Sequence, residues 1–309
     1  MAEMVTIHEF GHAYFMGILA SNEFEEPWLD EGVNSYWEQR IVDNYYGGGY
    51  GLLKLPFLRM SDADQGRIGY ITSASRNIAT NDLPSWMYPH GTYGMMSYNK
   101  AATWLHTLEG IIGTETMDNI FREYYRRWSF RHPSGRDFVS VVNEVVRSEH
   151  GDRFGENMNW FFDQVLYGSG ICDYRVSGVT GNRIRSYSGI VDGDSVTYSR
   201  SDRGSDTLFI SRVSLERLGD VMLPVEVLIG FDNGEEILET WDGKSLYKDF
   251  EYTRTGRAVW AKLDPNDKID MDVNRLNNSW TQEPAYTVTR RMMDKFLLMI
   301  QLMISIFTL

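Results

Sequence analysis

The stretch His8-Glu9-Phe10-Gly11-His12 decides how the first part of this 309-residue chain folds. Residues four apart on an α-helix lie on the same face, so a helix here turns the imidazoles of His8 and His12 toward one point. Glu9 then lies beside that point. Apolar residues continue at helical spacing, and the sequence predicts a helix from near the start to about Ala20.

A second helix is predicted to begin at Pro27, to carry Glu31 in its first turn, and to end at Gly47-Gly48-Gly49. Zinc binds imidazole nitrogen at about 2.0–2.1 Å and carboxylate oxygen at about 2.0–2.2 Å, and three such ligands leave a fourth position open for water. A carboxylate beside that position can take a proton from the water. His-Glu-x-x-His also arises by chance, and two helical histidines are often surface or core residues. On the metal interpretation, His8, His12 and Glu31 are the candidate ligands of one Zn²⁺, and Glu9 is the candidate catalytic base.

The spacing between His12 and Glu31 resembles that of a known family. Eighteen residues separate them, and Glu31 lies in the context Trp28-Leu29-Asp30-Glu31-Gly32. This pattern resembles the gluzincin aminopeptidases, the family of membrane alanyl aminopeptidase and leukotriene hydrolase, which have the same spacing within W-x-x-E-G. In the thermolysin family, the spacing between the second histidine and the glutamate differs by one residue. The resemblance implies a zinc metallopeptidase of aminopeptidase type, with one Zn²⁺ per chain and peptide substrates.

Tyr98 is the second candidate catalytic residue. Periodicity places it at the start of an inward-facing helical stripe, which by itself favours a core tyrosine. The same family carries Tyr-x-Lys-Gly or Tyr-x-Lys-Ala at this distance after the zinc helix, and Tyr98-Asn99-Lys100-Ala101 matches it. The resemblance implies that the Tyr98 hydroxyl donates to the oxyanion of the tetrahedral intermediate. Tyr93 is a competitor without a lysine two residues on, and His90 is interpreted as a structural or exposed histidine.

The predicted fold class is α+β with several domains. Residues 1–170 are expected to form a mainly helical, thermolysin-like zincin catalytic part, residues 171–278 an antiparallel β-sandwich, and residues 279–309 a C-terminal apolar helix or tail. Beyond Gly170 the hydrophobic period changes to two, which is typical of strands. Nothing in the predicted sandwich resembles a catalytic site, so its expected role is to support the helical part; a ligand-binding module is the alternative.

Local signals place the individual elements. Helices are expected over Thr114–Trp128, from Ser134 with its capping partner Asp137, and over Asn157–Tyr167, whereas 50–89 is expected to hold short helical pieces and loops. Strands are expected at Thr207–Val213, Val221–Phe231, Glu236–Trp241, Leu246–Tyr252 and Ala258–Leu263. Asn233-Gly234 and Asp242-Gly243 predict hairpin turns between strands.

Composition narrows the possible partners. The formal net charge is −13 and basic residues form no run, which argues against nucleic acid as a partner. Cys172 is the only cysteine, so the chain cannot form an internal disulfide or a cysteine-based zinc site. The compartment cannot be read from these features.

The two ends of the sequence carry further expectations. Met1 stands seven residues before His8 with no secretory signal, and the Gly-x-Met-Glu-Asn motif that holds the substrate amine in the resembled family is absent. We therefore expect the C-terminal part of a longer enzyme, or, as the alternative, a catalytically incomplete fragment serving as a scaffold or partner-binding module. The basic segment 290–295 leads into fourteen mostly apolar residues, fewer than the roughly 20 that span a bilayer. This tail predicts a buried or membrane-surface helix.

Overall fold

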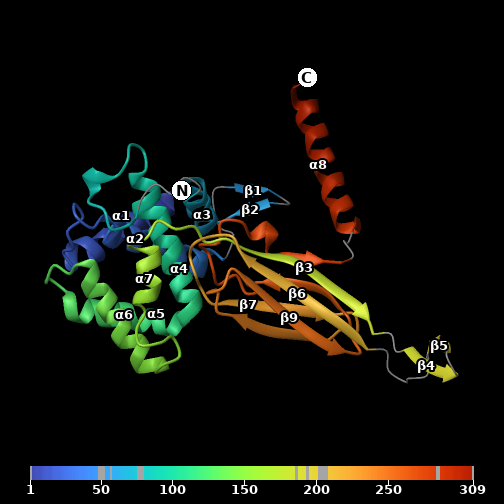
Figure 1. Ribbon diagram of the computed structural model, residues 1–309. Coiled ribbons are helices and arrows are strands. Elements are labelled where there is room, and N and C mark those ends of the chain that lie inside the picture. The colour runs from blue at the N-terminus through green and yellow to red at the C-terminus, as the bar shows by residue number, and fades with distance from the viewer. Residues whose placement is uncertain are drawn as a thin grey trace.

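The computed structural model describes residues 2–47, 53–55, 58–74, 80–184, 187–192, 195–200, 208–282 and 286–307. Most of the helices gather at one end of the molecule, and the long strands extend away from them (Figure 1). The helical segments are α1 (Ala2–His12), η1 (Ala13–Ile18), η2 (Pro27–Leu29), α2 (Glu31–Tyr46), α3 (Asp62–Ala74), η3 (Ser85–Met87), η4 (Met95–Lys100), α4 (Ala101–Ile112), α5 (Thr114–Trp128), α6 (Gly135–His150), α7 (Asn159–Val165), η5 (Arg275–Asn277) and α8 (Tyr286–Phe307). Some positions of the predicted segments lie outside these ranges: Met1, Gly48, Gly49, Thr207 and the last two residues, 308–309.

The first two helices follow the prediction. The π-helical segment η1 prolongs α1, and the left-handed backbone of Ala20, with φ of 57°, ends it. The 3₁₀ turn η2 leads into α2, which ends at Gly47 with φ of 83°. Trp28 in η2 is fully buried, with its ring centroid 5.3 Å from that of Trp104. This anchor fixes where α2 begins, and therefore where its first residue, Glu31, lies.

The segment between α2 and η4 is more regular than predicted. It contains the short antiparallel pair β1 (Leu53–Leu55) and β2 (Leu58–Met60), followed by the 13-residue helix α3. The prediction of short helical pieces was therefore wrong for this helix. Its start is a capping box: the backbone N–H of Ser61 donates to Asp64, and the backbone N–H of Asp64 donates to the Ser61 hydroxyl. The Ser-x-x-Asp spacing was the signal that could have revealed it.

Helices α4 to α7 contribute many of the buried side chains of the helical part. α5 covers the predicted range, and α6 begins with the predicted capping box, in which the backbone N–H of Ser134 donates to Asp137 at 2.8 Å. α7 is shorter than the predicted Asn157–Tyr167. The largest side chains on these helices, including Trp104 and Phe138, are fully buried in one cluster.

The strands after residue 170 form antiparallel sheets. They are β3 (Tyr174–Arg183), β4 (Tyr187–Asp192), β5 (Ser195–Arg200), β6 (Phe209–Arg217), β7 (Val225–Phe231), β8 (Glu236–Trp241), β9 (Tyr247–Arg254), β10 (Ala258–Leu263) and β11 (Ser279–Thr281). One sheet has the order β11-β10-β7-β8 and another β3-β6-β9, while β4 and β5 pair with each other. Buried residues of the two larger sheets, such as Val213 and Ile229, belong to a common core, as in a β-sandwich. Pro224, which has no N–H to donate, immediately precedes β7, so the strand starts later than the predicted Val221.

The two predicted hairpin turns have different outcomes. Asn233-Gly234 joins β7 and β8, which pair, with Gly234 at φ of 86°. Asp242-Gly243 also turns with positive φ, but β8 and β9 lie in different sheets, so the predicted hairpin at this position was wrong. A side chain at Gly243 would overlap the carbonyl of Leu223, because the turn packs closely against the interior. Turn chemistry therefore specified the chain reversal without specifying which strands pair.

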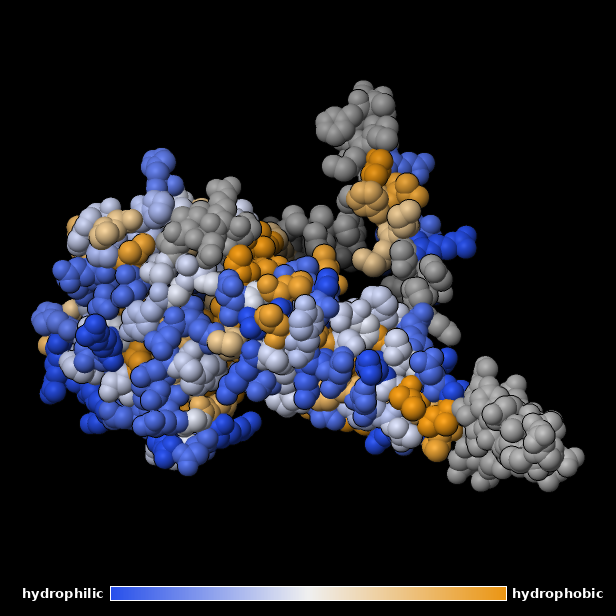
Figure 2. Space-filling model, viewed as in Figure 1, coloured by the Kyte–Doolittle hydropathy of each residue, from blue (hydrophilic) through white to orange (hydrophobic). Residues whose placement is uncertain are grey.

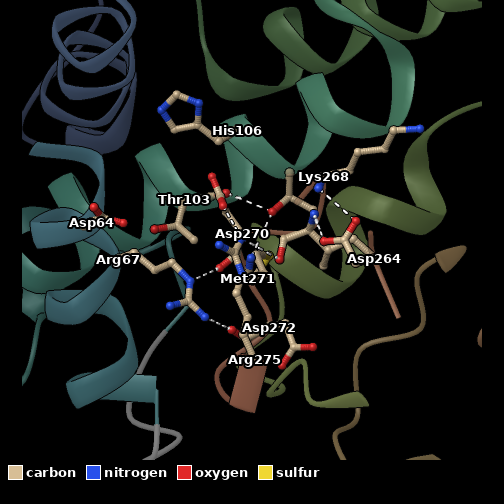
Figure 3. Close-up of polar contacts among 12 residues, drawn as sticks. Asp64, Arg67, Thr103, His106, Asp264, Lys268, Asp270, Met271, Asp272 and Arg275 are labelled. Atoms are coloured by element: carbon tan, nitrogen blue, oxygen red, sulfur yellow. Dashed lines mark hydrogen bonds and ion pairs between the residues drawn. The ribbon is translucent and has the colours of Figure 1, made fainter. Parts of the chain in front are cut away.

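The loop after β10 connects the strands to the helices (Figure 3). Arg67 of α3 donates to the backbone carbonyls of Asp270 and Asp272, the first at 3.0 Å. The backbone N–H of Met271 donates to the Thr107 hydroxyl of α4 at 3.1 Å. These bonds satisfy buried backbone groups of the loop and attach it to two helices.

Helix α8 projects from the rest of the molecule (Figure 1). The described part of its surface combines hydrophilic with hydrophobic side chains (Figure 2). The exposed apolar residues include Met292, Phe296 and Leu297. Within the described ranges, no helix is both long enough and apolar enough to cross a membrane. The predicted contact of this segment with a membrane surface stays a prediction.

Candidate metal centre

Three predicted ligand side chains lie together at one place. His8 and His12 project from the same face of α1, with ring centroids 4.9 Å apart, and Glu31 faces them from the first position of α2. One ligand atom from each residue lies within 4.8 Å of the other two. All three side chains are half-buried, which is compatible with a centre that substrate can reach.

The candidate ligands come together because α1 and α2 approach each other closely. A Cβ at Gly11 would overlap the side chain of Asn34, so glycine at this position of the His-Glu-x-x-His stretch permits the contact. The side-chain amide of Asn34 then donates to the backbone carbonyl of His8 at 2.6 Å. The ligand helix is therefore attached to α2 at the histidine itself.

The spacing of the donor atoms fits a metal ion. Nε2 of His8 lies 3.2 Å from Oε2 of Glu31, and Nε2 of His12 lies 3.6 Å from the same oxygen. Ligands about 2.1 Å from a tetrahedral ion are separated by roughly 3.4 Å. Two imidazole nitrogens and a carboxylate oxygen are also donors that zinc prefers. The donor set and its spacing therefore fit zinc.

Two further carboxylates, which the sequence interpretation missed, bind the other nitrogen of each imidazole. Nδ1 of His8 lies 3.0 Å from Oε2 of Glu38, and Nδ1 of His12 lies 2.7 Å from Oδ1 of Asp30. Glu38 follows Glu31 by seven residues, which is two helical turns, and this spacing was the available signal. Asp30 directly precedes Glu31, and its carboxylate is almost completely buried.

These contacts shift the pKa values of the groups involved. Burial lowers the pKa of His8, but hydrogen bonds to Glu31 and Glu38 outweigh it and raise that pKa to about 10. Burial acts to raise the pKa of Glu31, yet its hydrogen bonds to His8 and Tyr98 leave it lowered. Burial raises the pKa of Asp30 in spite of His12. The cluster therefore concentrates negative charge around two imidazoles, which favours a bound cation.

Tyr98 lies next to the three ligands. Its ring stacks on that of His8 with centroids 5.7 Å apart, and burial and the hydrogen bond to Glu31 raise the pKa of its hydroxyl. It lies in the π-helical η4 rather than in a regular α-helix, and such turns are frequent at functional sites. Tyr93, the competitor, is one ring further away, 6.4 Å from Tyr98. The lone His90 is exposed.

Two contacts hold η4 in place. A Cβ at Gly32 would overlap Ala101 and lie 2.6 Å from the backbone carbonyl of Ser97, so the glycine after Glu31 lets η4 approach α2. Lys100, at the end of η4, is buried and donates from Nζ to the carbonyl of Gly168 at 2.8 Å. Burial lowers the pKa of Lys100 to about 7.

Glu9 is exposed beside the ligands, as expected for a residue that contacts solvent or substrate. It lines a mostly polar cavity of about 260 Å³ together with His8, Glu38, Asp62 and Tyr98. Asp62 belongs to α3, and burial together with the charges of Glu38 and Asp43 raises its pKa to about 6. Water can therefore reach the predicted base and the predicted oxyanion donor from one space.

Known proteins resemble this chain. Residues 1–165 match the peptidase family M1 domain. Leucine aminopeptidase 2 of Emericella nidulans is 23% identical over 172 residues, covering 54% of this chain and 26% of that protein. A leukotriene A-4 hydrolase homolog of Botryotinia fuckeliana is 22% identical over 172 residues, covering 54% of this chain and 25% of that protein. Human aminopeptidase RNPEPL1 is 24% identical over 155 residues, covering 48% of this chain and 21% of that protein.

Among solved structures, aminopeptidase A of Legionella pneumophila in complex with aspartic acid aligns with a TM-score of 0.49 and 11% identity. The alignment covers 87% of this chain and 26% of that one. The chain spans about a quarter of the length of the curated relatives reported above.

Proposed function

Because the chain belongs to the peptidase M1 family, the gluzincin aminopeptidases, we propose that it is a zinc-dependent aminopeptidase that hydrolyses N-terminal peptide bonds. The relatives named above as aminopeptidases support this assignment. The one observation that carries it is the convergence of His8, His12 and Glu31, with ligand atoms within 4.8 Å of one another. We propose that these residues hold one Zn²⁺ and that 1–170 has the zincin fold.

Each side chain has one chemical task in this proposal. Zinc would act as a Lewis acid that polarises the substrate carbonyl and makes a water more acidic. Glu9 takes a proton from the attacking water and carries it toward the leaving amine. The Tyr98 hydroxyl donates a hydrogen bond to the oxygen that becomes negative as the carbonyl carbon turns tetrahedral. The hydroxyl is protonated at neutral pH, because burial and the hydrogen bond to Glu31 raise its pKa further above neutrality.

Specificity for a free amino terminus rests on the relatives' names, since the Gly-x-Met-Glu-Asn motif is absent from this sequence. The carboxylates of Glu9, Glu38 and Asp62 around the cavity offer negative charge for a substrate amine. An endopeptidase with the same water chemistry would have no requirement for that amine. Paired substrates with a free and an acetylated amino terminus separate the two activities, because only an aminopeptidase discriminates between them.

The first test is metal content. Elemental analysis of purified protein should give about one zinc per chain, and His12→Ala should lose it. His90→Ala is the matched control because His90 is an exposed histidine outside the cluster, and it should keep the zinc. Absence of zinc from the wild type after reconstitution would refute the proposal and leave the scaffold alternative.

The second test separates metal binding from chemistry. Glu9→Gln should keep zinc and lose hydrolysis of aminoacyl chromogenic substrates, because the amide cannot accept the proton. Hydrolysis at the wild-type rate in this variant would rule out Glu9 as the base. A zinc-loaded wild type that binds a partner but hydrolyses no peptide would instead support the scaffold alternative.

A further inference from the structure

Glu38 and Asp30 contact the candidate centre without being among its three ligands. We infer that they are positioning residues, each of which orients one histidine so that its Nε2 faces the metal; this inference rests on the zinc site of the proposed function. Glu38 lies in α2, the helix that also carries Glu31, and Asp30 is the residue that caps the start of this helix.

The hydrogen-bond chemistry assigns the ring nitrogens. An ionised carboxylate can only accept, so the contact of 3.0 Å between Nδ1 of His8 and Glu38 requires the imidazole to donate from Nδ1. Because that proton stays on Nδ1, Nε2, which lies 3.2 Å from Glu31, is the nitrogen that can give up its proton and bind a metal. Glu38 thus selects the tautomer that binds metal and fixes the plane of the ring.

Asp30 does the same for His12. Nδ1 of His12 lies 2.7 Å from Oδ1 of Asp30, while its Nε2 is turned toward Glu31. The Asp30 side chain is only 1% exposed, so its carboxylate has little water to compensate for loss of this partner. The two imidazoles therefore have equivalent surroundings, with a carboxylate at Nδ1 and the common Glu31 oxygen near Nε2.

The helical geometry ties these residues together. Glu31 and Glu38 are two turns apart on one face of α2, and Asp30 is the residue from which that helix starts. A single rigid element thus presents one ligand and both orienting groups to α1. Carboxylates that hold metal-binding histidines typically change metal affinity about 10–100-fold when they are removed.

A purely structural ion pair is the competing explanation. An ion pair stabilises the folded chain whether or not metal is present, whereas an orienting group acts on zinc affinity and on the ring tautomer. The test therefore compares zinc dissociation constants, measured by competition with a chromophoric chelator, with the unfolding free energy of the metal-free chain.

The variants are Glu38→Gln, Glu38→Ala, Asp30→Asn and Asp30→Ala in the full chain. Gln and Asn keep a carbonyl oxygen that can accept from Nδ1, so they should weaken zinc binding less than Ala does. For the Ala variants we expect the zinc dissociation constant to rise about 10–100-fold. Asp43→Asn is the control, since Asp43 lies on the same helix and has no direct contact with either imidazole among the interactions described. It should bind zinc as the wild type does.

A spectroscopic measurement supplies a second readout. Histidine-selective ¹⁵N NMR of the zinc-loaded chain should show Nδ1–H and metal-bound Nε2 for both rings, and Glu38→Ala should change only the His8 signals. The inference is overturned if the Ala variants bind zinc as tightly as the wild type, or if either ring binds through Nδ1. A wild type that binds no zinc would remove the proposed function and this inference together, whereas normal wild-type binding with unaffected variants removes the inference alone.

Discussion

At neutral pH, the buried amino group of Lys100 should make the stability of this chain depend on pH. Burial lowers its pKa to about 7 in the folded state, against an ordinary value of 10.5. Between these two values the unfolded chain binds more protons than the folded one, so the free energy of unfolding rises as pH increases. Burying the charged amino group lowers the free energy of unfolding by its full amount below about pH 7, and this loss disappears above the ordinary pKa of 10.5.

The magnitude follows from the same two values. Within the window, each pH unit changes the unfolding free energy by at most about 1.4 kcal/mol. Half of the folded population carries the proton at pH 7, so the gain between pH 7 and pH 9 is smaller than two full units and amounts to about 2 kcal/mol. Lys100→Met has no titrating group at this position and should lack this gain.

Urea unfolding followed by tryptophan fluorescence at pH 7, 8 and 9 measures the difference. Other groups titrate equally in both proteins, so the wild-type slope minus the Lys100→Met slope isolates Lys100. Lys244→Met is the control, because Lys244 is exposed and its removal should leave the wild-type slope unchanged. Equal slopes for wild type and Lys100→Met would refute the reasoning.

Three further predictions concern single substitutions. Tyr98→Phe should keep zinc and lower kcat on an aminoacyl chromogenic substrate about 10²–10³-fold, because it loses the donor to the oxyanion; an unchanged kcat would exclude that role. Gly32→Ala should lower the unfolding free energy by about 1–3 kcal/mol in urea titrations, because the new methyl overlaps Ala101 and meets the Ser97 carbonyl. Unchanged stability would mean that η4 moves away without cost. Asp137→Ala should cost about 1 kcal/mol in the same assay by removing the acceptor of the Ser134 backbone N–H, and no loss would show that water replaces it.

The sequence predicted the parts of the site that depend on local periodicity. His8 and His12 share a face because they are four residues apart, and the capping pair Ser134 and Asp137 marks the start of α6. The partners of the imidazoles were not predicted, since Glu38 and Asp30 acquire their roles only when α1 and α2 meet. Periodicity assigns a residue to a face without identifying what lies opposite.

The strands also show that local sequence signals do not specify contacts between distant segments. Asn233-Gly234 and Asp242-Gly243 are equivalent as local signals, and both turn with positive φ. Only the first joins paired strands: β8 pairs with its neighbour β7, whereas β9 pairs with β6, which is distant in sequence. β3, which was not assigned beforehand, contains Gly178 at a shift in register, and this irregularity weakens its alternating pattern. The roles of the candidate site residues stay predictions until zinc and turnover are measured.

The buried side chains of the helices and of the strands belong to one hydrophobic cluster, which also includes Cys172 and Tyr174. The bonds from Arg67 and Thr107 to the loop after β10 cross the same junction. Both halves therefore lose contacts when either one opens, and the chain should unfold cooperatively, with one calorimetric transition. A protein shortened to end near Gly170 would lack the backbone carbonyls that Arg67 binds, and it would populate partly unfolded forms even with His8, His12 and Glu31 all present.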